Sequence, residues 1–211
     1  MTGETIALFA QFVTAARGIW QGSAPEPRQR VYFANHTSNG DFVLLWTVLP
    51  RNMRRQTRPV AAADYWLTNR LRSFLGREVF NAVLIQRNPE LRTEDPVSQM
   101  VAALDEGASL IIFPEGGRNQ GEGLLPFKSG LFHLATARPE VDLVPAYISN
   151  LNRVLPKGEI VPVPMVCTVT FGAPLHLLEG EDKAAFLARA EKAVRDLGPA
   201  PQIPTSTEAR A

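Results

Sequence analysis

The chain has 211 residues, enough for one domain with a sizeable core, and 45% of them are hydrophobic, as in ordinary folded proteins. Its single cysteine, Cys167, excludes an internal disulfide and a multi-cysteine zinc site, and its apolar neighbours favour a small core residue over a reactive thiol. The net charge of +1 hides a basic segment, residues 51–92, in which nine arginines and three acidic residues give +6. This segment suits an anionic membrane surface or phosphate groups, and it lacks the interleaved aromatic residues that would favour nucleic acid.

The first predicted element is an amphipathic helix in residues 1–22. Apolar side chains recur at helical spacing between residues 6 and 20, at Ile6, Phe9, Val13, Ala16 and Trp20. The run is interrupted by polar residues and falls short of the roughly 18 to 20 apolar residues of a membrane span. The helix either packs on the domain or lies in a membrane interface, so we expect a peripheral rather than an integral protein.

From residue 30 onward, short apolar runs alternate with helical patterns. Strands are expected at residues 30–34, 59–63, 82–85, 109–113, 143–148 and 166–171. Helices are expected from residue 41 to just before Pro50, and at residues 64–75, 94–105 (with Thr93 as the cap), 129–137 and 182–197. This alternation predicts a single α/β domain over residues 30–197, with a mixed central sheet flanked by helices, followed by a flexible tail at residues 198–211.

The first chemical motif follows the strand at residues 30–34. His36 and Asp41 are separated by four residues, so the carboxylate can fold back on the imidazole and fix its tautomer. An imidazole ordinarily titrates near about pH 6.5, which suits a general base that removes a proton from a hydroxyl. There is no Gly-x-Ser-x-Gly elbow, which counts against a serine nucleophile. We therefore expect the hydroxyl to attack directly, without a covalent acyl-enzyme.

The second motif, Phe-Pro-Glu-Gly-Gly-Arg, occupies residues 113–118 after another apolar run. The planar guanidinium of Arg118 suits a phosphate monoester. Together the two motifs resemble the glycerophosphate and lysophosphatidate acyltransferase family, whose signatures are His-x4-Asp and Phe-Pro-Glu-Gly-x-Arg. Gly117 departs from the threonine that is usual in the family.

The resemblance implies a set of site residues. His36 and Asp41 would be catalytic, and Glu115, Gly116 and Arg118 would bind substrate. Glu115 would either bind an acceptor hydroxyl or brace the loop that carries Arg118. The resemblance also assigns the acceptor phosphate to Arg87, which is otherwise a surface arginine at a strand end. Lys128 is either a further phosphate-binding charge or a solvated side chain.

The family implies a transfer of a fatty acyl chain from acyl-CoA or acyl carrier protein to a glycerophospholipid precursor. The expected acceptor is 1-acyl-sn-glycerol 3-phosphate and the expected product is phosphatidate. Two alternatives remain, a non-catalytic lipid-binding protein on the same fold and a thioesterase. His133 and His176 lack metal-ligand spacing, so we expect no metal and no cofactor. The expected location is cytoplasmic, at the inner face of the cell membrane.

Overall fold

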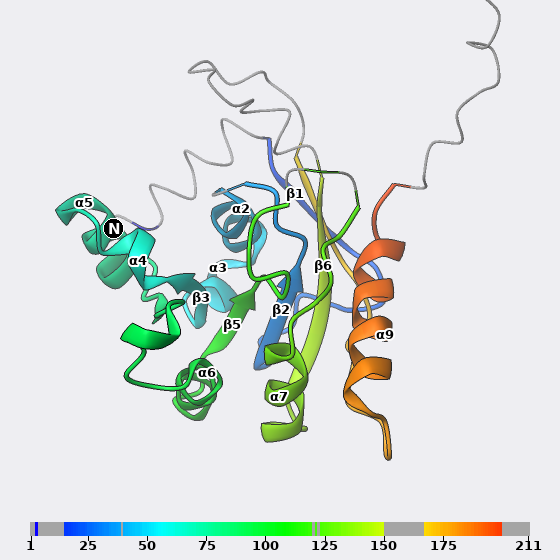
Figure 1. Ribbon diagram of the computed structural model, residues 1–211. Helices are drawn as coiled ribbons and strands as arrows, with labels where there is room; N and C mark the ends of the chain where they lie inside the picture. Colours follow the sequence, from blue (N-terminus) through cyan, green and yellow to red (C-terminus); the bar gives the residue numbers. More distant parts are fainter. Residues whose placement is uncertain are drawn as a thin grey trace, which may run out of the picture.

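The computed structural model describes residues 3, 15–38, 40–119, 121, 123–149 and 167–199. Seven strands form one sheet in the order β1-β7-β6-β2-β5-β3-β4 (Figure 1). They are β1 (Arg17–Trp20), β2 (Arg30–Ala34), β3 (Thr57–Ala62), β4 (Val83–Ile85), β5 (Ser109–Ile112), β6 (Asp142–Ser149) and β7 (Thr168–Phe171). All neighbouring strands run parallel except β6 and β7, so the predicted mixed α/β sheet is confirmed.

Helices cover both faces of this sheet. The α-helices are α2 (Asp41–Val48), α3 (Arg51–Arg54), α4 (Ala63–Trp66), α5 (Arg70–Phe74), α6 (Pro96–Asp105), α7 (Gly130–Ala137) and α9 (Lys183–Asp196). A π-turn, η1 (Leu75–Val79), and a 3₁₀ turn, η2 (Pro89–Leu91), complete the described elements.

The strand β2 shows how the sheet separates two cores. All five of its residues are buried, and successive side chains point to opposite faces. Tyr32 and Ala34 join the core beneath α2, whereas Val31 and Phe33 join the core beneath α6, α7 and α9. A central strand covered on both faces explains why the four residues after Arg30 form a continuous apolar run.

The predicted N-terminal helix is wrong at its C-terminal end. Residues 17–20 form β1, which pairs in parallel with β7 at the edge of the sheet. Ala15 has a φ of 44°, and the Trp20 ring stacks on Phe171 with 4.1 Å between centroids. The edge of β7 offers backbone hydrogen bonds, and Gly18 weakens a helix, so the strand is favoured. Residues 4–14 lie outside the described part of the chain, as do residues 200–211 of the predicted tail.

Two further local predictions need correction. The helix expected at residues 64–75 is divided, because Asn69 caps a separate α5 by accepting a hydrogen bond from the backbone N–H of Arg72. The cap of α6 is Asp95 rather than Thr93, with Pro96 in the first helical turn. The remaining predicted strands and helices are present with ends shifted by a few residues.

Cys167 is fully buried, and this burial raises the pKa of its thiol. The residue therefore belongs to the core, as expected.

Candidate active site

The site begins where β2 ends. Asn35 bonds to the backbone of Ile148 on β6 in both directions: its Nδ2 donates to the carbonyl at 3.1 Å, and its Oδ1 accepts from the N–H at 2.7 Å. This pair of bonds ties the first residue after β2 to the neighbouring strand. The next residue, His36, is thereby held at the carboxyl end of the sheet, where ligands gather in open α/β folds.

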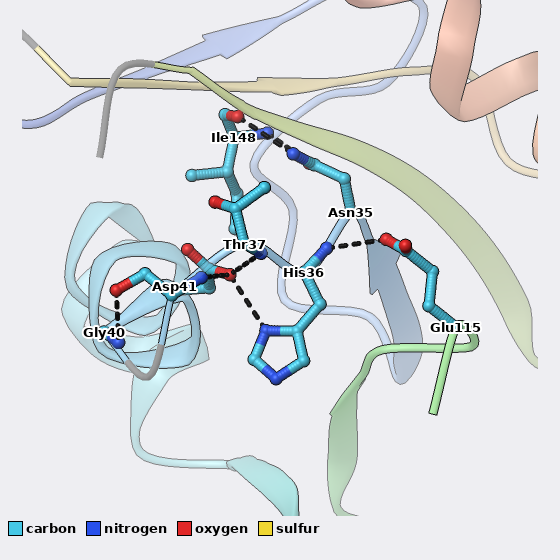
Figure 2. Close-up of polar contacts among 8 residues, drawn as sticks. Asn35, His36, Thr37, Gly40, Asp41, Glu115 and Ile148 are labelled. Atoms are coloured by element: carbon cyan, nitrogen blue, oxygen red, sulfur yellow. Dashed lines mark hydrogen bonds and ion pairs between the residues drawn. The ribbon is translucent and has the colours of Figure 1, made fainter. Parts of the chain in front are cut away.

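Asp41 folds back onto His36 at the start of α2 (Figure 2). The Asp41 carboxylate is fully buried, and its Oδ2 lies 2.9 Å from the Nδ1 of His36. The same oxygen accepts backbone N–H bonds from Thr37 at 2.6 Å and Ser38 at 2.8 Å. Three donors therefore fix this oxygen, and the carboxylate fixes the tautomer in which His36 carries its proton on Nδ1.

The imidazole of His36 is also held from its face. The Phe113 ring stacks on it with 4.3 Å between centroids and 20° between planes. Nδ1 is engaged by Asp41, so Nε2 is the nitrogen that remains for a substrate, and His36 lines the adjacent cavity. The residues are thus arranged as an oriented base at the edge of an open cavity.

Glu115 acts behind the site rather than in it. Its Oε1 accepts the backbone N–H of His36 at 2.8 Å, and its Oε2 accepts that of Leu125 at 2.9 Å. Glu115 is buried and is absent from the residues that line the cavity. Burial raises the pKa of its carboxyl despite these two bonds. Of its two expected roles, the contacts support bracing, and the braced segments are the end of β2 and the loop before α7.

The cavity beside His36 has a volume of about 440 Å³. Apolar side chains form much of its wall, namely Phe42, Val60, Ile85, Met100, Ile112 and Leu131. Arg87, Gly116, Arg118 and Lys128 line the same cavity, so the fold brings together the predicted substrate-binding residues apart from Glu115. The cavity therefore combines an apolar wall with a cationic rim, as an acyl chain and a phosphate would require.

The cations of this rim differ in their partners. Arg118 and Lys128 are exposed, and neither forms an ion pair with a described residue. Arg87 instead holds Asp64 through two hydrogen bonds, of 3.1 and 2.6 Å. The bond from Arg87 lowers the pKa of the Asp64 carboxyl. A phosphate that approaches Arg87 must therefore compete with a carboxylate already in place.

Gly116 is required by the turn that carries Arg118. Its φ is +69°, and a Cβ built on it would lie 2.6 Å from Cε of Lys128. The Lys128 backbone N–H bonds the carbonyl of Pro114 at 2.8 Å, so the lysine packs directly over this turn. Glycine is needed both for the left-handed backbone and for the close approach of the lysine.

Most residues of the cavity wall were not predicted as site residues, and three of them carry polar or aromatic side chains near the rim. Arg92, Tyr65 and Trp66 line the cavity, and Arg92 donates to the backbone carbonyls of residues 86 and 87. Arg92 belongs to the arginine-rich segment, but the sequence offered no reason to choose it. The described residues contain no group of three or more histidine, cysteine, aspartate or glutamate side chains that could hold a metal ion.

A family model matches the part of the chain that contains this site. The family model "Acyltransferase" matches residues 21–149, which include both motifs and all the residues that line the cavity. The chain belongs to the acyltransferase family.

Similar curated proteins include the 1-acyl-sn-glycerol-3-phosphate acyltransferases of Haemophilus influenzae and Escherichia coli. The first is 33% identical over 136 residues, covering 58% of this acyltransferase chain and 51% of the relative. The second is 32% identical over 136 residues, covering 58% and 50%. The chain thus matches about half the length of these relatives.

A solved structure has the same fold. The 1-acyl-sn-glycerophosphate (LPA) acyltransferase PlsC from Thermotoga maritima has a TM-score of 0.69 and 21% identity. The match covers 92% of this acyltransferase chain and 76% of that chain.

Proposed function

We propose that the protein transfers a fatty acyl chain from a thioester, acyl-CoA or acyl carrier protein, to 1-acyl-sn-glycerol 3-phosphate, which gives phosphatidate. The observation that carries this proposal is the 2.9 Å contact between His36 Nδ1 and the buried Oδ2 of Asp41, beside a cavity with a cationic rim. Family membership and the names of the curated relatives support the same reaction.

In the proposed reaction, the acceptor hydroxyl attacks the carbonyl carbon of the thioester. His36 Nε2 accepts the hydroxyl proton as the new C–O bond forms, and Asp41 stabilises the resulting imidazolium. The tetrahedral intermediate then collapses with cleavage of the C–S bond, and the leaving thiolate takes the proton from Nε2. The products are an ester and a free thiol, and His36 returns to its initial state.

The rim and the wall of the cavity have separate roles in this proposal. Arg118, Lys128 and Arg87 bind the phosphate of the acceptor, because charge-assisted hydrogen bonds favour a dianionic group over a neutral one. The apolar wall binds the acyl chain. No described helix is long and apolar enough to cross a membrane. We propose that the protein acts as a peripheral protein on an anionic membrane surface, at the inner face of the cell membrane.

The test is a thioester-release assay with a panel of acceptors. Purified protein is given acyl-CoA or acyl carrier protein thioesters, alone or with glycerol 3-phosphate, 1-acylglycerol 3-phosphate or lysophospholipids. Release that depends on 1-acylglycerol 3-phosphate, with phosphatidate as the product, supports the proposal. Release without any acceptor indicates a thioesterase, and the absence of release under all conditions indicates a non-catalytic lipid-binding protein.

A further inference from the structure

The end of α4 and the helix α5 expose three large apolar side chains close together in the sequence. Leu67, Leu71 and Phe74 are 43%, 69% and 48% exposed, and they lie within eight residues of one another. Seven large hydrophobic residues are exposed in the described part of the chain, and three of them belong to this group. We call Leu67, Leu71 and Phe74 the α5 patch.

The helix α5 has no buried face of its own. None of its five residues is buried, whereas six of the eight residues of α2 are. A helix normally buries its apolar side against the domain, and a clustered apolar surface usually marks a site of interaction. In the described part of the chain, the α5 patch is therefore an apolar surface exposed on a helix that has no buried residue.

Arginines lie among and beyond the residues of the patch along the chain. Arg70 and Arg72 lie between its members, Arg77 lies three residues after Phe74, and none of the three forms an ion pair with a described residue. The Arg72 guanidinium lies over the Tyr65 ring, 4.5 Å from its centroid. Apolar side chains flanked by guanidinium groups without a carboxylate partner among the described residues match the surface of an anionic bilayer, which offers an apolar interior beneath a layer of negative charge.

The α5 patch is also close to the cavity. Tyr65 and Trp66 of α4 line the cavity wall, and η1 packs back on Trp66, where a Cβ at Gly76 would lie 3.1 Å from the Trp66 ring. The helices α4 and α5 follow the carboxyl end of β3, the same end of the sheet at which His36 follows β2 (Figure 1). A membrane bound at α5 would thus lie beside the entrance for lipid substrates.

We propose that the α5 patch docks the protein on an anionic lipid bilayer, with Leu71 and Phe74 inserted among the lipids and Arg70 and Arg77 at the headgroups. This inference rests on the proposed function, because it places a lipid-binding cavity at the bilayer. Trp20, which the sequence placed on the apolar face of the expected N-terminal helix, instead stacks its ring on Phe171.

The test compares three variants of the full chain with the unaltered protein in vesicle sedimentation. Leu71→Ser/Phe74→Ser removes the apolar patch at exposed positions. The control, Leu178→Ser, alters a side chain that is 58% exposed. Leu178 comes three residues after Leu175, which pairs with Leu143 at the amino end of β6, the end of the sheet opposite His36. Vesicles are phosphatidylcholine alone or phosphatidylcholine with about a third phosphatidylglycerol, and thermal unfolding checks that each variant is folded.

The proposal expects the double variant to bind the mixed vesicles at least about tenfold more weakly, and Leu178→Ser to bind them like the unaltered protein. Arg70→Gln/Arg77→Gln should lose the preference for anionic vesicles. Equal binding by the double variant and the unaltered protein would overturn the proposal, as would a loss of self-association instead of vesicle binding. Activity on a short-chain, water-soluble acceptor should survive in the double variant. If the unaltered protein binds vesicles through α5 but transfers no acyl group, the proposed function fails and the docking surface stands.

Discussion

The proposed catalytic pair and the cationic rim are built differently, although His36 and the rim line the same cavity. Asp41 is fully buried and its Oδ2 accepts three hydrogen bonds, while Asn35, Phe113 and Glu115 hold His36 from its backbone and its ring face. Arg118 and Lys128 are exposed, without an ion pair to a described residue. In the proposed function, His36 is therefore positioned as a base before the substrate arrives, whereas the exposed cations of the rim can adjust to the headgroup.

This difference predicts how substitutions divide between turnover and binding. A preorganised base contributes to the transition state, so its loss should lower kcat. Exposed cations hold the acceptor in the ground state as well, so their loss should raise the acceptor KM. The predictions below test this division, beginning with the largest expected effect.

Replacement of the catalytic pair should have the largest effect. His36→Ala and Asp41→Asn should each lower kcat by about 10²- to 10⁴-fold, the usual contribution of a general base. Asparagine keeps an oxygen for the three donors but removes the charge that stabilises the imidazolium. The measurement is steady-state turnover with thermal unfolding, and the control is His133→Ala, an exposed histidine of α7 outside the cavity lining. Near-normal turnover in a folded His36→Ala variant would exclude this mechanism.

Arg118→Ala should mainly affect the acceptor. Loss of a charge-assisted hydrogen bond to phosphate should raise the acceptor KM by about 1.5–3 kcal/mol, roughly 10- to 150-fold, with little change in the donor KM. Arg118→Lys should recover part of this, because lysine keeps the charge without the planar fork. An equal rise in both KM values would show that the loop has collapsed.

Gly116→Ala should affect both stability and the acceptor. A left-handed backbone costs a residue with a Cβ roughly 1–2 kcal/mol, and the new Cβ would displace Lys128. Gly107→Ala is the matched control, because Gly107 has a φ of +83° but open space around it. Both variants should lose stability in urea unfolding, and only Gly116→Ala should raise the acceptor KM. A similar KM for the two variants would remove Lys128 from phosphate binding.

Arg87→Ala should have a smaller effect than Arg118→Ala. Arg87 already forms an ion pair with Asp64, and exposed ion pairs are worth about 0–1 kcal/mol. When Arg87 exchanges Asp64 for the phosphate of the acceptor, the net gain in binding free energy is therefore small. Asp64→Asn should lower the acceptor KM, because it leaves Arg87 free for the phosphate. An Arg87→Ala effect as large as that of Arg118→Ala would contradict the competition between Asp64 and phosphate.

Glu115 should add a modest pH dependence to stability. Burial raises its pKa, so the folded protein binds this proton more tightly than the unfolded chain. Its contribution to stability is complete below the ordinary glutamate pKa and is lost as the pH rises through the raised pKa. Across this window, the free energy of unfolding should fall for the unaltered protein relative to Glu115→Gln. Parallel urea-unfolding curves for the two proteins at all pH values would refute this.

Local motifs made part of this site predictable from sequence. His36 and Asp41 are close along the chain and follow a buried strand, so their spacing alone predicted a contact between them. The structure contains this contact. Gly116, Arg118 and Lys128 lie near one another in one loop. The cavity also includes Arg87. To predict that Arg87 lies near this loop, one must know the order of the strands in the sheet, and no local sequence pattern contains that order.

Other features depended on partners far away in the sequence. The strand β1 forms because β7, about 150 residues later, presents an unpaired edge, so a helical apolar spacing was misleading there. Asp64 could not be assigned to Arg87, because 23 residues separate them. The role of Glu115 became clear only from its bond to the backbone of His36, 79 residues away.

The central claim is that His36 acts as a base for direct transfer and does not itself carry the acyl group. The most direct measurement mixes the protein with a labelled acyl thioester, first without and then with 1-acylglycerol 3-phosphate, and follows released thiol and intact protein mass in the first turnover. The account predicts no burst of thiol and no added mass until the acceptor is present, followed by thiol and phosphatidate in equal amounts. A burst of one thiol per protein molecule, with an acyl group added to the chain before any acceptor is supplied, would contradict it.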